Sequence, residues 1–193
     1  TEAVRRRYYS QLAPPAVTGV RALVDSASLL WRWRMAITGW DVFDDEAAPP
    51  PVEPVLAAVD PAMLTSPQTP FVALHAAVAL AAARDLDRLG QLRAHCAGSR
   101  EPQLRRIVAP VCDALTAADS RSWSQCWRLL DDVMPDLVKV GGSAAQREVV
   151  EETLLFALVH DGQVERALTL LDARLERRSY PVDSRRRGGL VRV

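Results

Sequence analysis

Apolar residues recur at intervals of three and four positions along most of this sequence, which is the spacing of amphipathic helices. In residues 20–38, two apolar stripes run along the same segment. The first stripe consists of Ser26, Leu30, Trp33, Ile37 and Trp40, and the second of Val20, Val24, Ala27, Trp31 and Met35. A helix that is apolar on two sides packs between neighbours, so residues 20–38 are predicted to form the core helix of the fold.

Three later segments share one pattern, an Ala-Leu pair followed by a short polar turn and a second helical stretch. The pairs begin at Ala79, Ala114 and Ala157, and the turns are expected near Arg84-Asp85, at Asp119-Ser120 and at Asp161-Gly162. The spacings of 35 and 43 residues lie near the period of about 34 residues of tetratricopeptide-type hairpins. We therefore predict an all-α protein, a tetratricopeptide-like array of helical hairpins (an α-α superhelix), with residues 134–142 as an extended loop.

The composition favours a helical fold and argues against binding to nucleic acid or to a membrane. Of 193 residues, 49% are hydrophobic, and Ala, Leu and Arg are abundant while isoleucine is rare, which favours helices over strands. Because 24 basic residues balance 24 acidic ones, we expect no binding to nucleic acid. No apolar run approaches the ~18–20 residues of a membrane span, so no membrane association is expected. Cys96, Cys112 and Cys126 are expected to be reduced thiols of a cytoplasmic protein.

Proline and acidic residues mark a loop. Seven of the thirteen prolines lie between Pro49 and Pro70, and residues 41–83 carry six acidic residues but no Lys or Arg. Since proline is excluded from helix interiors, residues 41–54 are predicted to be a proline-rich acidic loop, with at most a short helix near 54–59.

Basic residues mark a tail. Residues 174–193 carry seven arginines against two acidic residues, and they include Pro181 and the pair Gly188-Gly189. We predict that residues 179–193 form an extended or disordered basic tail, which leaves residues 1–178 as a single helical-repeat domain.

Three stretches carry a family likeness. Residues 141–148, Gly-Gly-Ser-Ala-Ala-Gln-Arg-Glu, resemble the Gly-Gly-Ser-His-Ala-Gln-Arg-Asp signature of the tetratricopeptide repeat protein 38 family. Residues 28–32, Ser-Leu-Leu-Trp-Arg, and residues 71–76, Phe-Val-Ala-Leu-His-Ala, are similar to two further stretches of that family, in the same order. The resemblance covers about residues 26–178 and the C-terminal part of a family member only.

The resemblance implies an α-helical repeat fold and carries no settled chemistry. The histidine of the family signature is Ala144 in this chain, and the acidic residue before the family's helical histidine is Ala73. Any role of that imidazole, or of a histidine–acid pair, is therefore not carried over to this sequence.

The Gly-Gly-Ser motif also has a physical interpretation of its own. Gly141-Gly142 permits a sharp turn, and Ser143 with Gln146 forms a Ser-x-x-Gln capping box that begins a helix over residues 144–160. Arg147 can pair with a glutamate four residues later on the helix surface. The alternative is that the free N–H groups of this helix start hold an anion.

The ionisable side chains offer few candidates for catalysis. His75 is expected to be a hydrogen-bonded core or groove residue, with a functional role as the alternative. His95 and Cys96 are adjacent on a helix and point about 100° apart, which is poor geometry for a nucleophile and its base. His160 ends a helix, where the dipole favours a cationic imidazole. The cluster Glu148, Glu151 and Glu152 is expected on a solvated face.

Tryptophan is frequent for a chain with so few aromatic residues. Trp123 and Trp127 lie four positions apart on one helix face. These large side chains are expected to fill the space between hairpins, and the alternative is an aromatic groove for a peptide or an apolar small molecule.

The leading hypothesis is a non-enzymatic interaction or scaffold protein that binds another polypeptide or its own copy. The runner-up is a cofactor-independent enzyme or small-molecule binder, for example of a biosynthetic pathway, with a pocket near Trp31, Trp33, His75 and Arg147. No motif for a metal, a cofactor or a catalytic nucleophile occurs, so none is predicted. The candidate partner-binding or ligand-binding residues are Trp31, Trp33, His75, Trp123, Trp127, Ser143, Gln146 and Arg147.

Overall fold

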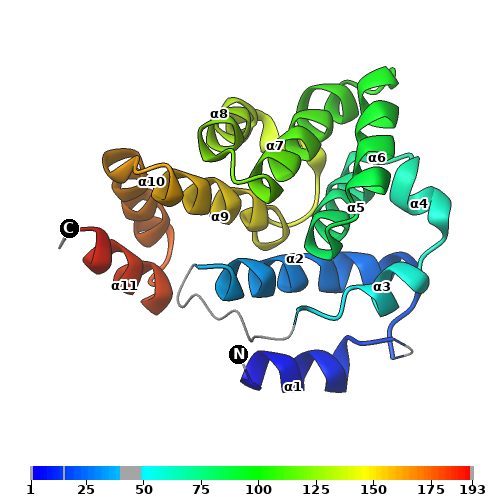
Figure 1. Cartoon of the computed structure of the whole chain (residues 1–193), viewed down its shortest axis with the longest axis horizontal. Helices are drawn as coiled ribbons and strands as arrows, with labels where there is room; N and C mark the ends of the chain where they lie inside the picture. The colour runs from blue at the N-terminus through cyan, green and yellow to red at the C-terminus, as the bar shows by residue number, and fades with distance from the viewer. Residues whose placement is uncertain (1, 15, 40–48, 192–193) are drawn as a thin grey trace.

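A computed structural model describes residues 2–14, 16–39 and 49–191 of the chain, with side chains from Arg5 onward in the first of these ranges. Its regular elements are all helices, and the described ranges contain no β-strand (Figure 1). The elements are α1 (Glu2–Gln11), α2 (Gly19–Ile37), α3 (Glu53–Ala57), α4 (Pro61–Thr65), α5 (Pro70–Ala83), α6 (Leu86–Gly98), η1 (Leu104–Val108), α7 (Ala109–Asp119), α8 (Trp123–Val133), η2 (Met134–Val140), α9 (Ala144–His160), α10 (Val164–Arg177) and α11 (Pro181–Leu190). The prediction of an all-α protein is confirmed.

Three helical hairpins follow one another along the chain: α5–α6, α7–α8 and α9–α10 (Figure 1). Their turns lie where the sequence predicts them, directly after Ala83, Asp119 and His160. Successive hairpins pack through α6 against α7 and through α8 against α9. The fold therefore contains the predicted helical pairs in the predicted order.

The helix α2 crosses the hairpins and packs against both α5 and α9 (Figure 1). Both predicted apolar stripes contribute buried residues, Leu30 and Trp33 from one and Trp31 and Met35 from the other, but Val20 of the second stripe is 37% exposed. Trp31 Nε1 donates a 2.8 Å hydrogen bond to Thr153 Oγ1 of α9, which fixes the C-terminal half of α2 on that helix. Trp40, which the pattern also placed on this helix, lies outside the described residues.

The innermost helix is α5 and not α2, which corrects the prediction of the core helix. Every residue from Ala73 to Ala82 is buried, whereas Arg21 and Asp25 of α2 are exposed. The small alanine side chains of α5 permit α2, α4, α6 and α7 to pack around it. A helix covered on all sides has no polar face, so periodicity alone did not identify it.

The predicted proline-rich loop over residues 41–54 lies largely outside the described residues. The short helix expected near 54–59 is present as α3, and α4 follows it without having been predicted. Asp60 begins α4, because its side chain accepts a 2.9 Å hydrogen bond from the Ala62 N–H.

Two predicted irregular segments are in fact helical. Residues 134–142 were expected to be an extended loop, but Met134–Val140 forms the 3₁₀-helix η2, whose first turn accommodates a proline. Residues 179–193 were expected to be an extended or disordered tail, but Pro181–Leu190 forms α11. The α11 residue Asp183 is 1% exposed and accepts a 2.8 Å hydrogen bond from Arg174 Nε. This tertiary contact outweighs the low helix propensity of Gly188 and Gly189.

Candidate functional site

A small pocket lies where α2, α9 and the turns of the first two hairpins meet. Its volume is about 150 Å³, and we call it the tryptophan pocket. Its lining comes from α2, the end of α7, the start of α8, α9 and the two turns. The lining residues are Trp31, Arg34, Met35, Thr38, Arg84, Ala118, Asp119, Arg121, Trp123 and Phe156.

Three aromatic rings form the apolar wall of the tryptophan pocket. Trp31 is 6% exposed and is held by its hydrogen bond to α9. Trp123, at the start of α8, packs its ring edge-on to Phe156 at 5.5 Å between centroids and stacks on His160 at 4.9 Å. These contacts fix the orientation of the Trp123 ring from one side.

Arginine dominates the polar part of the same pocket. Arg84 donates two hydrogen bonds to Asp119, of 2.7 and 3.2 Å, so this pair is neutral. Arg34 Nε donates a 2.5 Å hydrogen bond to the Ala82 carbonyl oxygen. Among the residues that the structure describes, no carboxylate pairs with Arg34 or with Arg121.

The pKa of the Arg34 guanidinium is lowered from its ordinary value. Burial is the largest cause, and the positive charge of Arg84 adds to it, while Asp119 acts in the opposite direction. The lining holds three arginines and one carboxylate, so its positive charge is not fully neutralised. An anion entering the pocket would therefore be attracted by unpaired guanidinium groups.

Both arginines at the hairpin turns adopt a backbone conformation that favours glycine. Arg84 (φ 59°) and Arg121 (φ 57°) are the two non-glycine residues with positive φ in the described ranges, and both line the tryptophan pocket. The third hairpin has Gly162 (φ 71°) at the corresponding position. Such strain costs about 1–3 kcal/mol per residue and clusters at functional sites.

The three turns share the same hydrogen bonds. In each, the left-handed residue donates to a carbonyl three positions earlier, and the next N–H donates to a carbonyl five positions earlier. These pairs are Arg84–Ala81 and Asp85–Leu80, Arg121–Ala118 and Ser122–Ala117, and Gly162–Val159 and Gln163–Leu158. The three turns thus have the same hydrogen-bond geometry, and two of them carry an arginine where the turn would favour glycine.

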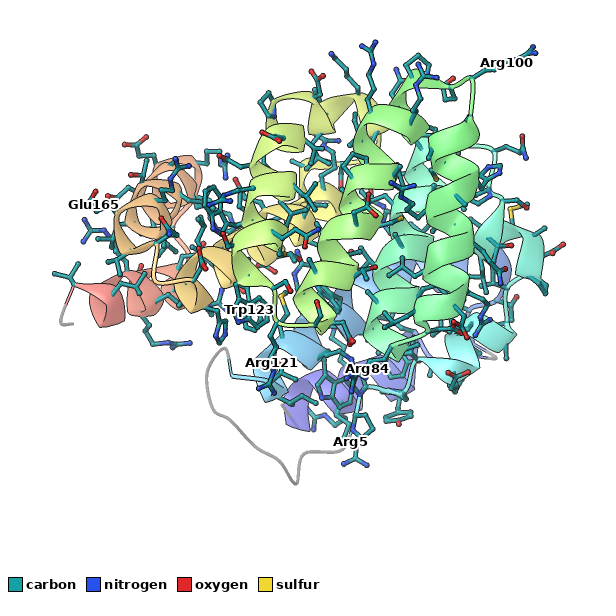
Figure 2. All side chains as sticks on the ribbon, turned by 45° about the horizontal axis from the view of Figure 1, so that its top comes forward. Arg5, Arg84, Arg100, Arg121, Trp123 and Glu165 are labelled. Atoms are coloured by element: carbon teal, nitrogen blue, oxygen red, sulfur yellow. The ribbon has the colours of Figure 1, made fainter. Side chains whose placement is uncertain are left out.

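An open groove of about 640 Å³ continues from the tryptophan pocket along α8. It shares Trp123 and Arg121 with the pocket, and it also contains Ser124, Gln125 and Arg128. Figure 2 shows Arg84, Arg121 and Trp123 together at one end of the hairpins. The pocket and the groove therefore form one continuous surface around Trp123.

The structure brings Trp31 and Trp123 together in the tryptophan pocket, and it brings Ser143, Gln146 and Arg147 together at the start of α9. Trp33 is 8% exposed and fills the core. Trp127 donates a 2.7 Å hydrogen bond from Nε1 to Asp161 Oδ2, and the guanidinium groups of Arg128 and Arg166 lie 5.2 and 4.9 Å from its ring centroid. Trp127 thus connects α8 to the turn of the third hairpin.

His75 is a core residue on α5. It is 2% exposed, its Nδ1 lies 2.8 Å from the Phe71 carbonyl oxygen, and its buried Nε2 has no hydrogen-bond partner. Because Nδ1 faces a carbonyl oxygen, that nitrogen carries a proton, and a second proton on the buried Nε2 would have no acceptor, so the imidazole is neutral. Burial lowers the pKa of His75, which agrees with this state.

The contacts and pKa shifts of His95, His160 and Cys96 also do not favour a catalytic role. His95 Nε2 lies 3.1 Å from the Pro67 carbonyl oxygen, and burial raises the pKa of Cys96 to about 11, so the two form no nucleophile pair. Burial and the charge of Arg121 lower the pKa of His160, which contradicts the expected cationic imidazole. The described residues contain no group of three side chains that could hold a metal ion.

Ser143 and Gln146 form the predicted capping box. Ser143 Oγ accepts from the Gln146 N–H at 3.3 Å, and Gln146 Oε1 accepts from the Ser143 N–H at 2.8 Å. The helix α9 accordingly begins at Ala144, as predicted. Arg147 donates to the carbonyl oxygens of Gly141, at 2.9 Å, and Gly142, and so closes the turn.

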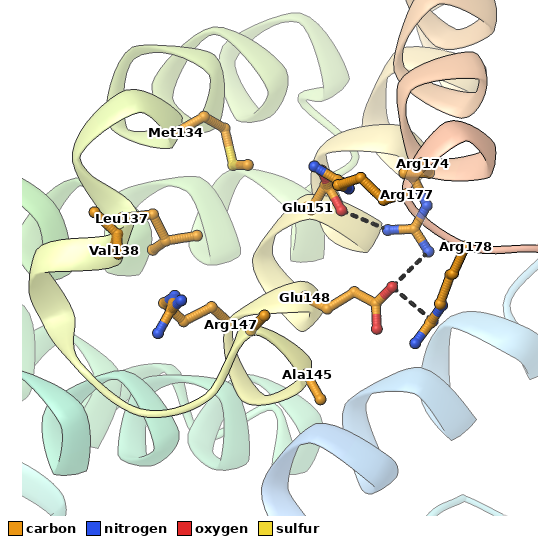
Figure 3. A pocket seen from close by; sticks show the side chains of 11 residues that line it. Met134, Leu137, Val138, Ala145, Arg147, Glu148, Glu151, Arg174, Arg177 and Arg178 are labelled. Carbon is orange, nitrogen blue, oxygen red and sulfur yellow. Dashed lines mark hydrogen bonds and ion pairs between the residues drawn. The ribbon is translucent and has the colours of Figure 1, made fainter.

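Arg147 also lines a second cavity, between η2 and the pair α9–α10 (Figure 3). The predicted pairing of Arg147 with the glutamate four positions later is wrong, because Glu151 is 7% exposed and binds Arg174 and Arg177 instead. The expectation of a solvated glutamate face is wrong for the same reason. Arg174, 2% exposed, reaches from α10 to the buried glutamates of α9.

Two comparisons with known proteins bear on this chain. No protein-family model matches it, and no solved structure matches it. Within the described residues, no helix is both long enough and apolar enough to cross a lipid bilayer. The function must therefore be inferred from the pocket and its surroundings.

Proposed function

We propose that this protein is a helical-repeat interaction module that binds an acidic segment of another polypeptide at the tryptophan pocket. The observation that carries the proposal is the composition of that pocket, three guanidinium groups and one carboxylate beside three aromatic rings. Arginine recognises carboxylates through parallel N–H donors, and aromatic walls lower the local dielectric and strengthen that contact.

The size of the pocket supports a polypeptide partner. Sites for whole small-molecule ligands have about 300–1,000 Å³, whereas the tryptophan pocket has about 150 Å³. That volume suits one anchoring side chain. The open groove on the other side of Trp123 offers room for the residues that flank this anchor.

The two left-handed arginines at the hairpin turns support the same proposal. Arg84 and Arg121 hold left-handed backbone positions at a free-energy cost, and both direct their side chains to this pocket. The alternative, a cofactor-independent enzyme with His75 as acid or base, is less well supported, because His75 is 2% exposed and lies outside the pocket.

The repeated turn geometry supports the proposal that α5–α10 form a tetratricopeptide-like array, to which the family resemblance of residues 141–148 adds. The free, buried thiols of Cys96, Cys112 and Cys126 support a cytoplasmic location, where cysteines stay reduced.

The proposal is tested by calorimetric titration of the protein with acetylated hexaglutamate, with hexaglutamine and hexalysine as matched peptides. We expect binding of hexaglutamate alone, and a loss of affinity of about tenfold in Arg121→Gln, since a hydrogen bond to a charged group contributes about 1.5–3 kcal/mol. Arg100→Gln, at an exposed arginine far from the pocket (Figure 2), is the control. Equal binding of hexaglutamine and hexaglutamate would refute the proposal.

A further inference from the structure

The cavity between η2 and α9–α10 is separate from the tryptophan pocket and differs from it in chemistry. We call it the η2 cleft, and its volume is about 340 Å³. Unlike the tryptophan pocket, it is large enough to take a whole small ligand. Its lining residues are Met134, Leu137, Val138, Ala144, Ala145, Arg147, Glu148, Glu151, Arg174, Arg177 and Arg178.

One wall of the η2 cleft is apolar. Met134, Leu137 and Val138 of η2 form it, and they face α9 across the opening (Figure 3). The Val138 residue is 63% exposed, although valine is among the residues most often buried. An aliphatic chain lying on this wall would remove that surface from water, at about 25 cal/mol per Å² of buried apolar area.

The opposite wall carries Arg174, Arg177 and Arg178, each of which pairs with a glutamate of α9. Glu151 accepts hydrogen bonds from Arg174 (2.8 Å) and Arg177 (2.6 Å), and Glu148 accepts one from Arg178 (2.7 Å) (Figure 3). Both glutamates are therefore neutralised. Arg177 and Arg178 each use one terminal nitrogen in these bonds, and their side chains remain 60% and 50% exposed.

Arg147 lies between the two walls. Its Nη1 donates to the carbonyl oxygens of Gly141 and Gly142, and among the described residues no carboxylate pairs with it. The guanidinium is thus held in place by backbone and still carries an uncompensated positive charge with free N–H donors. The lining as a whole holds four arginines and two glutamates.

We propose that the η2 cleft binds an aliphatic carboxylate of medium chain length. Its hydrocarbon chain lies on Met134, Leu137 and Val138, and its carboxylate accepts hydrogen bonds from Arg147 and from the exposed edge of Arg178. The charge of the cleft selects an anion, and the apolar wall selects one with a hydrocarbon body.

The probe is octanoate, titrated into the full chain by calorimetry, with acetate and octylammonium as matched ligands. Acetate has the same charge without the chain, and octylammonium has the same chain with the opposite charge. We expect octanoate to bind at least tenfold more tightly than either. Equal binding of octanoate and acetate, or of octanoate and octylammonium, would overturn the proposal.

Two variants locate the site. Val138→Ser removes the exposed apolar contact, and Arg147→Gln removes the charge, and each is expected to weaken octanoate binding about tenfold. Leu86→Ser, at a residue 39% exposed on α6, and Arg100→Gln are the matched controls. If Arg147→Gln loses helical structure, Val138→Ser still decides the question, because the side chain of Val138 is exposed. Wild-type affinity in Val138→Ser would refute the site.

Discussion

At Arg121 the conformation of the backbone and the proposed binding function oppose each other. A left-handed conformation costs an L-residue roughly 1–2 kcal/mol, and replacement by glycine removes this cost. The larger conformational entropy of glycine in the unfolded chain offsets part of that gain in stability. We therefore expect Arg121→Gly to raise the free energy of unfolding by about 0.5–1 kcal/mol, as measured by urea denaturation, while weakening the binding of hexaglutamate.

Arg121→Ala is the matched control for this prediction. It removes the guanidinium but keeps the Cβ, so it is expected to lose affinity without gaining stability. A glycine variant less stable than the wild type would show that the turn is not strained at this position.

His75 is expected to make stability depend on pH. Its pKa is lowered in the folded protein by burial, so in the folded state the imidazole stays neutral below the unfolded pKa of about 6.5, where the unfolded chain already takes up a proton. The free energy of unfolding should therefore fall as the pH decreases from 7.5 to 5.5. Urea denaturation across this range should show a smaller fall in His75→Gln than in the wild type. An unchanged pH dependence in this variant would contradict the assignment.

The residue scale also shows what the sequence could not reveal. Ser143 and Gln146 act on neighbours three positions away, so their capping box was predictable from local pattern. Arg174 contacts glutamates more than twenty positions earlier, and Trp31 contacts Thr153 at a separation of 122 residues. No local pattern encodes such pairs. The one usable signal for the site was an arginine, not a glycine, at two of three hairpin turns.

At the scale of elements, the junction between η2 and α9 depends on one close approach. A Cβ on Gly142 would lie 2.8 Å from Cδ2 of Phe71, and the φ of this residue is +71°. Gly141 has a positive φ of +90° with open space around it. We expect Gly142→Ala to lower the free energy of unfolding more than Gly141→Ala does, because it adds a steric clash to the backbone strain. Equal losses in thermal or urea denaturation would contradict this packing.

The helix α11 is joined to α10 by two ion pairs. Asp183 pairs with Arg174, and Arg187 pairs with Asp172 at the surface. We expect Asp183→Ala to release α11 and so to increase amide hydrogen exchange in residues 181–190, with little change in α5–α8. Asp172→Ala, which breaks the exposed pair, should have a smaller effect. Unchanged exchange in Asp183→Ala would show that α11 docks through other contacts.

The helices were easier to predict than their packing, because local residues mark where a helix begins and ends. The polar turns and the serine cap are local signals, and they placed α5–α6, α7–α8 and α9–α10 correctly. The helix α11 was missed, since its two glycines have a low helix propensity. Burial of Asp183 against α10 is a tertiary effect, which composition does not contain.

At the scale of the whole molecule, a neutral chain hides local charge. The 24 basic and 24 acidic residues cancel overall, but the fold groups three arginines with one aspartate in the tryptophan pocket. Recognition of an acidic partner is thus compatible with zero net charge. Because the pocket contacts are partly exposed, we expect the affinity for hexaglutamate to decrease with rising salt concentration.

The central claim is that an acidic segment binds beside Trp123, and the indole N–H signals of the tryptophans in a ¹⁵N-correlated NMR spectrum test it most directly. Addition of hexaglutamate should shift the signals of Trp123 and Trp31, which line the pocket, and leave that of the core residue Trp33 unchanged. Unmoved signals of Trp123 and Trp31 at peptide saturation would contradict the account.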